Sequence, residues 1–257
     1  MVATIRRREL LVSGGITIAG AALPLHRPVA ATSVTTALQW IIVDAVLPQL
    51  TYQPKAPVLK LGADIVKYTS FATFSGNPVA GPAGYAMYDN EARINPPWPT
   101  PANEQANPPK YMRCFGQLGH AKRFLAICAP GLDLANADPD KLPGQTNAEW
   151  YLANQIAWHA ARHADVAHIQ AQSLIGQGAS AFQTFATSAA SQVTHANPYC
   201  VPSAGLSTTH GTPDENVAAF QLVFPGIPWF WLNVPAPNPD YAGASSILQQ
   251  CETIAGL

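Results

Sequence analysis

Short apolar runs recur along the chain, and segments with helical patterning separate them. The runs lack a strict alternation of apolar and polar positions, as expected for strands that are buried on both faces. Strands that alternate with helices predict a parallel sheet. The clear runs are residues 85–88, 123–129, 166–170, 200–206 and 229–232. Two earlier runs, residues 40–43 and 65–68, are candidate strands on either side of a proline-rich connection.

Capping residues mark the starts of the helices. Thr146 and Glu149 form a capping-box pattern, and Thr212 and Glu215 form a second one with proline at the first helical position. Asn107, which also precedes a proline, predicts another start. The expected helices run from the 100–109 segment to about residue 121 and cover residues 146–163, 179–195, 212–224 and 241–254.

This order of elements predicts an α/β fold, a (β/α)8-type (TIM-like) barrel that could be irregular or incomplete. The 257 residues, 48% of them hydrophobic and 11% charged, suffice for one barrel domain. An open, doubly wound sheet is the alternative. No glycine-rich phosphate loop follows any strand, which disfavours the nucleotide-binding version of that sheet.

The first 31 residues have the pattern of a targeting segment. Arg6–Arg8 is followed by Glu9 and a soft apolar stretch to Leu25, and Val29–Ala31 offers small residues for cleavage. This resembles a twin-arginine export signal, with residues 7–11 as the motif. We therefore expect a signal peptide at 1–31, a single barrel domain at 32–257 and a secreted protein. The apolar stretch is too short for a membrane span, so no stable span is expected after cleavage.

Charge and composition narrow the expected partners. Without residues 1–31 the chain carries 10 basic and 14 acidic residues, a net charge of −4. It has no basic stripe and no cluster of Lys and Arg among aromatic residues, so nucleic acid is not an expected partner. For a mildly acidic exported protein we expect a small-molecule or carbohydrate ligand.

The most informative polar residues follow the apolar run at 85–88. Asp89 and Glu91 lie two positions apart at the end of this strand. If the strand continued, both side chains would face the same side, at the end of the barrel where chemistry takes place. One could be a general acid and the other a charged partner that raises its pKa. The competing interpretation is that either residue caps a loop or pairs with Arg93.

Neutral hydrogen-bonding residues end the later strands. Amides that face a pocket suit hydroxyl-rich ligands, because each can donate and accept, and tryptophans offer apolar platforms for a ring. These side chains could instead satisfy buried backbone groups at the rim. The candidate substrate-binding residues are Asp133, Gln170, Gln172, Ser207, Trp231 and Asn233, with Trp98 and Trp229 as further platforms.

Histidines and cysteines give weaker signals, and we expect no metal site and no cofactor. His159 and His163 have helical spacing but no third ligand nearby, which favours a solvated helix face. His210 could serve as an acid or base. The cysteines form no Cys-x-x-Cys pair, export would permit disulfides, and three pairings remain open. Buried, unpaired thiols are the alternative for the two in predicted strands. The cysteines are Cys114, Cys128, Cys200 and Cys251.

Several segments together resemble a group of uncharacterised exported bacterial proteins that are similar in plan to glycoside-hydrolase-like TIM barrels. The resemblance spans roughly residues 60–250. The segments are residues 88–91, 100–105, 130–134, 169–173, 205–208 and 230–233.

The resemblance implies a carbohydrate-acting barrel, with Asp89 and Glu91 as the catalytic acid/base pair. The chain departs from a standard glycosidase because its later strands end in amides, where a second carboxylate is expected. Two alternatives therefore stay open. One is a non-catalytic barrel that binds carbohydrate or another small molecule, and the other is a lyase or cyclase that uses a single acid.

Overall fold

The computed structural model describes residues 37–76, 83–92 and 100–257. Within them, parallel strands close into one barrel in which every strand pairs with its neighbours in chain order and β8 pairs with β1. The predicted TIM-like fold is therefore confirmed, and the open doubly wound sheet is excluded. The strands are β1 (Gln39–Val43), β2 (Val58–Leu61), β3 (Ile65–Tyr68), β4 (Tyr85–Asn90), β5 (Leu125–Pro130), β6 (Val166–Ile169), β7 (Val201–Ser207) and β8 (Trp229–Asn233).

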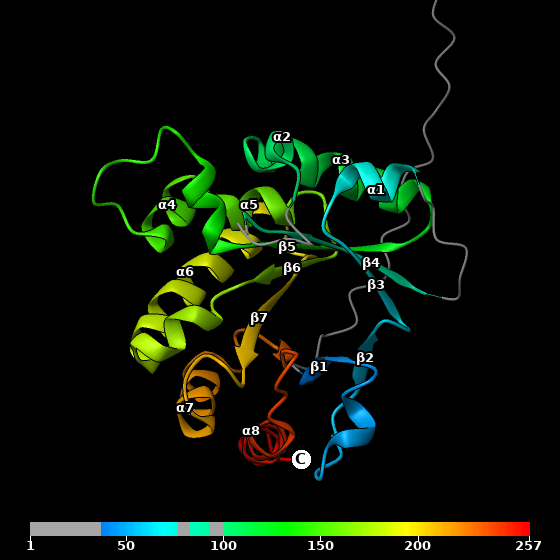
Figure 1. The fold of residues 1–257 in the computed structure, drawn as a ribbon, viewed down its shortest axis with the longest axis vertical. Helices are drawn as coiled ribbons and strands as arrows, with labels where there is room; N and C mark the ends of the chain where they lie inside the picture. The colour runs from blue at the N-terminus through cyan, green and yellow to red at the C-terminus, as the bar shows by residue number, and fades with distance from the viewer. Residues whose placement is uncertain (1–36, 77–82, 93–99) are drawn as a thin grey trace, which may run out of the picture. The chain divides into compact units, whose positions relative to one another are not determined.

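Helices pack against the outside of the strands, as Figure 1 shows for α3 and for α6 to α8. They are α1 (Phe71–Gly76), α2 (Ala102–Gln105), α3 (Pro108–Ala121), α4 (Asn147–Ala153), α5 (Ile156–Ala161), α6 (Ala179–Ala196), α7 (Pro213–Val223) and α8 (Tyr241–Ile254). Short 3-10 turns are η1 (Leu47–Gln49), η2 (Leu132–Ala137) and η3 (Gln172–Gln177).

The helix starts predicted at Asn107, Thr146 and Thr212 are confirmed in detail, whereas the 100–109 segment contains the starts of two helices, α2 and α3, instead of one. Both capping boxes form, with the threonine side chain accepting from the backbone of the glutamate and the glutamate carboxylate accepting in return. Asn107 caps α3 by accepting from the backbone N–H of Lys110. The single helix expected at 146–163 is wrong, because Gln155 has a left-handed backbone (φ 52°) that divides it into α4 and α5.

The first third of the barrel is irregular. β2 lies within the segment that the sequence indicated as a connection, so that interpretation is corrected. A turn of only three residues joins β2 to β3, and the two strands pair through Leu61 and Ile65 alone. Gly62 (φ 107°) supports this turn, and its N–H donates to the Ile65 carbonyl at 2.9 Å. The helix that normally separates two parallel strands is replaced by this turn.

The core has two parts. One fills the inside of the barrel with side chains from alternate strand positions, among them Ile41, Met87, Ile127 and Trp231. The other lies between the strands and the helices and is much larger. Because the lower interior is packed with apolar side chains, polar groups inside the barrel gather at the carboxyl ends of the strands.

A buried carboxylate on α8, the last helix, binds to the first strand and to the segment that follows it. Glu252 of α8 is fully buried and accepts from the indole of Trp40 at 3.0 Å and the hydroxyl of Tyr52 at 2.7 Å. It also accepts from the backbone N–H groups of Lys55 and Ala56. A buried charge is tolerable only with such a set of donors. Glu252 therefore fixes α8 against β1 and the connection to β2.

The four cysteines, all within the described residues, are free thiols, and Cys128, Cys200 and Cys251 are buried. Residues 1–31, Arg93 and Trp98 lie outside the described residues. In the described part of the chain, no helix is both long and apolar enough to span a bilayer.

Two glycines of α3 give a matched test of the packing of α3 against the segment after α5. A Cβ on Gly116 would overlap the backbone carbonyl group of His163, whereas a Cβ on Gly119 would make an ordinary 3.6 Å contact with Ala126. We expect Gly116→Ala to lower the free energy of unfolding by roughly 1–3 kcal/mol. Gly119→Ala should raise it by about 0.5–1 kcal/mol, because alanine favours the helix. Urea unfolding of both variants checks this, and equal effects would contradict the packing described.

Candidate functional site

A polar cavity of about 420 Å³ lies at the carboxyl ends of the strands. Two further cavities share lining residues with it. The smaller has a volume of about 130 Å³ and the larger about 580 Å³. The central cavity gathers residues from strands β3, β4 and β8 and from the segments that follow β4, β6, β7 and β8. Its lining comprises Lys67, Asp89, Glu91, Gln170, Gln172, Thr209, His210, Trp231, Asn233, Pro235 and Ala236.

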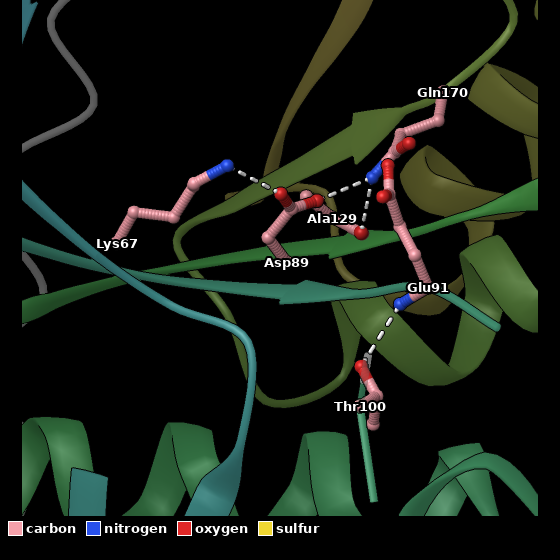
Figure 2. Close-up of polar contacts among 6 residues, drawn as sticks. All are labelled: Lys67, Asp89, Glu91, Thr100, Ala129 and Gln170. Atoms are coloured by element: carbon pink, nitrogen blue, oxygen red, sulfur yellow. Dashed lines mark hydrogen bonds and ion pairs between the residues drawn. The ribbon is translucent and has the colours of Figure 1, made fainter. Parts of the chain in front are cut away.

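Asp89 lies on the floor of this cavity with its carboxylate held on both sides. β4 extends two residues further than predicted and places Asp89 opposite Ala129 of β5. One carboxylate oxygen accepts from the ammonium group of Lys67 at 2.9 Å, and the other from the amide of Gln170 at 2.6 Å. Figure 2 shows this chain of contacts, which continues from Gln170 to the Ala129 carbonyl at 2.8 Å. The carboxylate therefore has a fixed orientation.

Glu91 follows β4 and faces the same cavity as Asp89. The two carboxylates lie on the same side of the chain, as Figure 2 shows, which agrees with the expectation from their spacing. The backbone of Glu91 is anchored to Thr100, because its N–H donates to the Thr100 hydroxyl at 3.0 Å and its carbonyl accepts from the Thr100 N–H at 3.4 Å. The side chain also lines the smaller adjoining cavity.

Asp133 joins Glu91 in the smaller cavity. It lies at the start of η2, just after β5, and the two side chains meet over Gly131. The Asp133 Oδ1 atom is 2.5 Å, and the Glu91 Cγ atom 3.1 Å, from the point where a Cβ of Gly131 would stand. A Cβ at this position would therefore crowd both side chains. The structure thus brings two carboxylates together across β4 and β5.

The two predicted amides after β6 both face the cavity. Gln170 is buried and holds Asp89, as described above. Gln172 begins η3 and passes over Gly205 of β7, where its Oε1 atom lies 2.5 Å from the position of an absent Cβ. That oxygen is buried and, within the described residues, has no hydrogen-bond donor. Because Gln172 also lines the cavity, a rotation of its side chain would present this unpaired acceptor to a ligand hydroxyl.

Trp231 and Asn233 of β8 form the opposite wall. The ammonium group of Lys67 lies 5.5 Å from the centre of the Trp231 ring, within the range of a cation–π contact. Beneath them, His168 of β6 bonds Ser203 of β7 at 2.9 Å and packs against Trp231. Burial lowers the pKa of His168 to about 3, so it is neutral at pH 7 and supports the wall without adding charge.

Two predicted binding residues lie away from the cavity. Ser207 is fully buried, and its hydroxyl lies 3.0 Å from that of Thr209, while its backbone exchanges hydrogen bonds with the amide of Asn216. Trp229 lies two residues before Trp231 in β8 and packs edge-on against Tyr85. Neither is among the described residues that line the three cavities.

Lys67 is the main site residue that the sequence reasoning missed. It lies in the middle of an otherwise apolar strand, the run Ile65–Tyr68, and that position was the available signal. A lysine inside a barrel strand is costly unless a carboxylate accompanies it. Among the described residues, no group of three His, Cys, Asp or Glu side chains is arranged to hold a metal ion.

Comparison of the sequence with protein-family models and with curated proteins finds no match to either. The function must therefore be argued from the site itself.

The pairing of Lys67 with Asp89 predicts a coupled effect on stability. The Asp89 side chain is only 5% exposed and that of Lys67 38%. Lys67→Met leaves a nearly buried carboxylate with one donor fewer, so we expect a loss of roughly 1–2 kcal/mol, less than for a fully buried pair because solvent screens the lysine. Adding Asp89→Asn should recover part of this loss. Urea unfolding of the two single variants and the double variant measures the coupling. Strictly additive effects would show that the contact has no energetic role.

Proposed function

We propose that this chain is an exported, glycoside-hydrolase-like enzyme that cleaves a carbohydrate at the barrel mouth. The observation that carries the proposal is a single cavity that contains the carboxylates of Asp89 and Glu91, amide side chains and the indole of Trp231. Carboxylates supply acid/base chemistry, amides bind hydroxyl groups, and an indole can pack against a sugar ring. The TIM-like barrel is compatible with this chemistry, although the fold alone does not imply it.

Glu91 is the proposed proton donor and acceptor. It reaches both the central and the smaller cavity, so a glycosidic oxygen bound between them would lie beside it. Protonation of that oxygen lets the bond to the anomeric carbon break, and water completes the hydrolysis.

Asp89 is the proposed charged partner that stabilises the positive charge on the sugar ring. Its fixed orientation between Lys67 and Gln170 suits this role, because the carboxylate needs no rearrangement during the reaction. Residues two apart on a strand are separated by roughly 6.5–7 Å along the chain. That spacing falls in the range of roughly 6.5–9.5 Å between the carboxyl groups of inverting enzymes and exceeds the roughly 5–5.5 Å of retaining ones.

Of the remaining predicted residues that line the cavities, some can contact the ligand and one, Asp133, can act on Glu91. Gln172 and Asn233 offer hydrogen bonds to ligand hydroxyls, and Trp231 offers an apolar surface. Asp133 lies beside Glu91 and can orient either that carboxylate or a substrate hydroxyl. Export through the segment at 1–31 would deliver the barrel to extracellular carbohydrates, and so we propose a secreted location.

Residues 32–257 should release product from at least one member of a panel of bacterial and plant polysaccharides. We expect Glu91→Gln to lower turnover by roughly a hundredfold or more, because it removes the transferable proton. Its melting temperature should stay close to that of the wild type. Asp89→Asn should also lose activity.

Asp214→Asn is the matched control for these variants, because Asp214 is exposed on α7 and is not among the residues that line the three cavities. Retained turnover in Glu91→Gln would exclude its proposed role.

A specific observation favours a second candidate, a barrel that binds carbohydrate without cleaving it. Asp89 is already engaged by two donors, and the ends of β6 and β8 present amides rather than a further carboxylate. This candidate predicts that a glycan raises the melting temperature of the wild type while no product forms.

Glu91→Gln should keep that ligand-induced stabilisation if the barrel only binds. A lyase or cyclase using Glu91 as a single acid would instead release a product that has not incorporated water, which mass spectrometry distinguishes.

A further inference from the structure

A second cavity, separate from the barrel mouth, is lined by basic side chains. Its volume is about 360 Å³, and it lies between the first half of α3 and the end of α5. Among its described lining residues there is no carboxylate. The lining consists of Asn107, Pro109, Lys110, Arg113, His159, Arg162 and His163, none of which lines the cavities at the barrel mouth.

The packing of α3 against the end of α5 builds this cavity. Gly116 has no Cβ, and the backbone carbonyl of His163 lies in the space where one would stand. Arg113 and His163 are therefore brought to the same cavity from two different elements. The guanidinium of Arg162 stacks over the Trp158 ring at 4.6 Å, and His159 packs edge-on against the same ring at 4.9 Å. These contacts restrict the side chains before any ligand binds.

The cavity concentrates positive charge on an otherwise acidic chain. Lys110, Arg113 and Arg162 are three of the ten basic residues that follow position 31. In the described part of the chain none of the three is ion-paired with a carboxylate. The three cations face one cavity with no carboxylate among its described lining residues, so they repel one another, and an anion would relieve that repulsion.

We propose that this cavity binds a tetrahedral oxyanion, a phosphate or sulfate group. Arg113 and Arg162 would contact its oxygens with their planar guanidinium groups, and Lys110 would supply a third charge. A volume of about 360 Å³ exceeds that of a lone ion, so part of the molecule that carries the group would also fit. The inference does not depend on the function proposed for the barrel mouth.

The two histidines make binding depend on pH. Burial lowers the pKa of His163, and the charges of Arg162 and Arg113 lower it further, with smaller contributions from His159 and His120. Burial and Arg162 likewise lower the pKa of His159. A bound anion favours the protonated imidazoles and raises both pKa values. Affinity must therefore increase as the pH falls through the histidine range. Of the neighbouring groups, His120 is already paired with Asp165 at 2.8 Å.

The test is a calorimetric titration of the purified full chain with sulfate, whose charge is constant over this range, at constant ionic strength against chloride. We expect saturable binding that tightens by at least about threefold between about pH 8 and pH 5.5, on either side of the ordinary histidine pKa. Arg113→Gln with Arg162→Gln should weaken binding by roughly tenfold, because two charged contacts to the anion are lost.

Two further variants make the result specific. Lys55→Gln removes one charge outside the cavity and should leave the affinity unchanged. His163→Gln should bind sulfate at the higher pH but show a weaker pH dependence. Equal affinity in the wild type and the double arginine variant, or an equal loss in Lys55→Gln, would overturn the proposal.

A sulfated polymer tests whether the preferred ligand is a free ion or a sulfate group carried by a larger molecule. Tighter binding of dextran sulfate than of free sulfate, lost in the double arginine variant and absent with neutral dextran, would identify a sulfated chain as the preferred ligand. Equal affinity per sulfate for both would identify the free ion. Sulfate and phosphate compared at the higher pH show which oxyanion is preferred.

Discussion

The closure of β8 against β1 is the constraint on which the site depends. It places Trp231 and Asn233, from the last strand, across the mouth from Asp89, which comes from the middle of the chain. In an open sheet of the same strand order, β8 would lie at one edge and β4 in the middle of the row, and no mouth would enclose their residues. Closure also confines the polar residues to one rim, because apolar side chains fill the barrel below them. The cavity therefore exists only when all the strands are paired and the barrel is closed.

Much of the barrel could be predicted from the sequence, because the local signals for helices and strands agreed with the pattern of buried residues. Capping boxes at Thr146 and Thr212 fixed two helix starts, and unbroken apolar runs marked strands buried on both faces. β2 was missed for a physical reason. It is only four residues long, contains Lys60 and lies between a proline and a glycine, and no helix follows it. Its strand structure comes from pairing with β1, which no local pattern records.

The location of the site could be predicted from the sequence, but the contacts between its side chains could not. Polar residues at strand ends did gather, as the geometry of parallel strands requires. The pairing of Asp89 with Lys67 depends on barrel register, and the burial of Ser207 depends on Asn216 reaching back from α7. Glu91 and Asp133 meet because Gly131 leaves space between them. Each of these contacts joins different elements, so spacing along the chain could not specify them.

The pairing of β1 with β8 also has a consequence for the order in which the chain folds. β1 pairs with one of its two partners about 190 residues later in the sequence, and the 52–56 segment is bound by Glu252 of α8, 196 to 200 residues later. During synthesis, the edge of β1 stays uncovered until β8 has been made and can pair with it. Such long-range closure implies slow, late-stage folding. A nascent chain with an uncovered strand edge is open to misassociation, so the pairing of β8 and the docking of α8 protect the folded barrel.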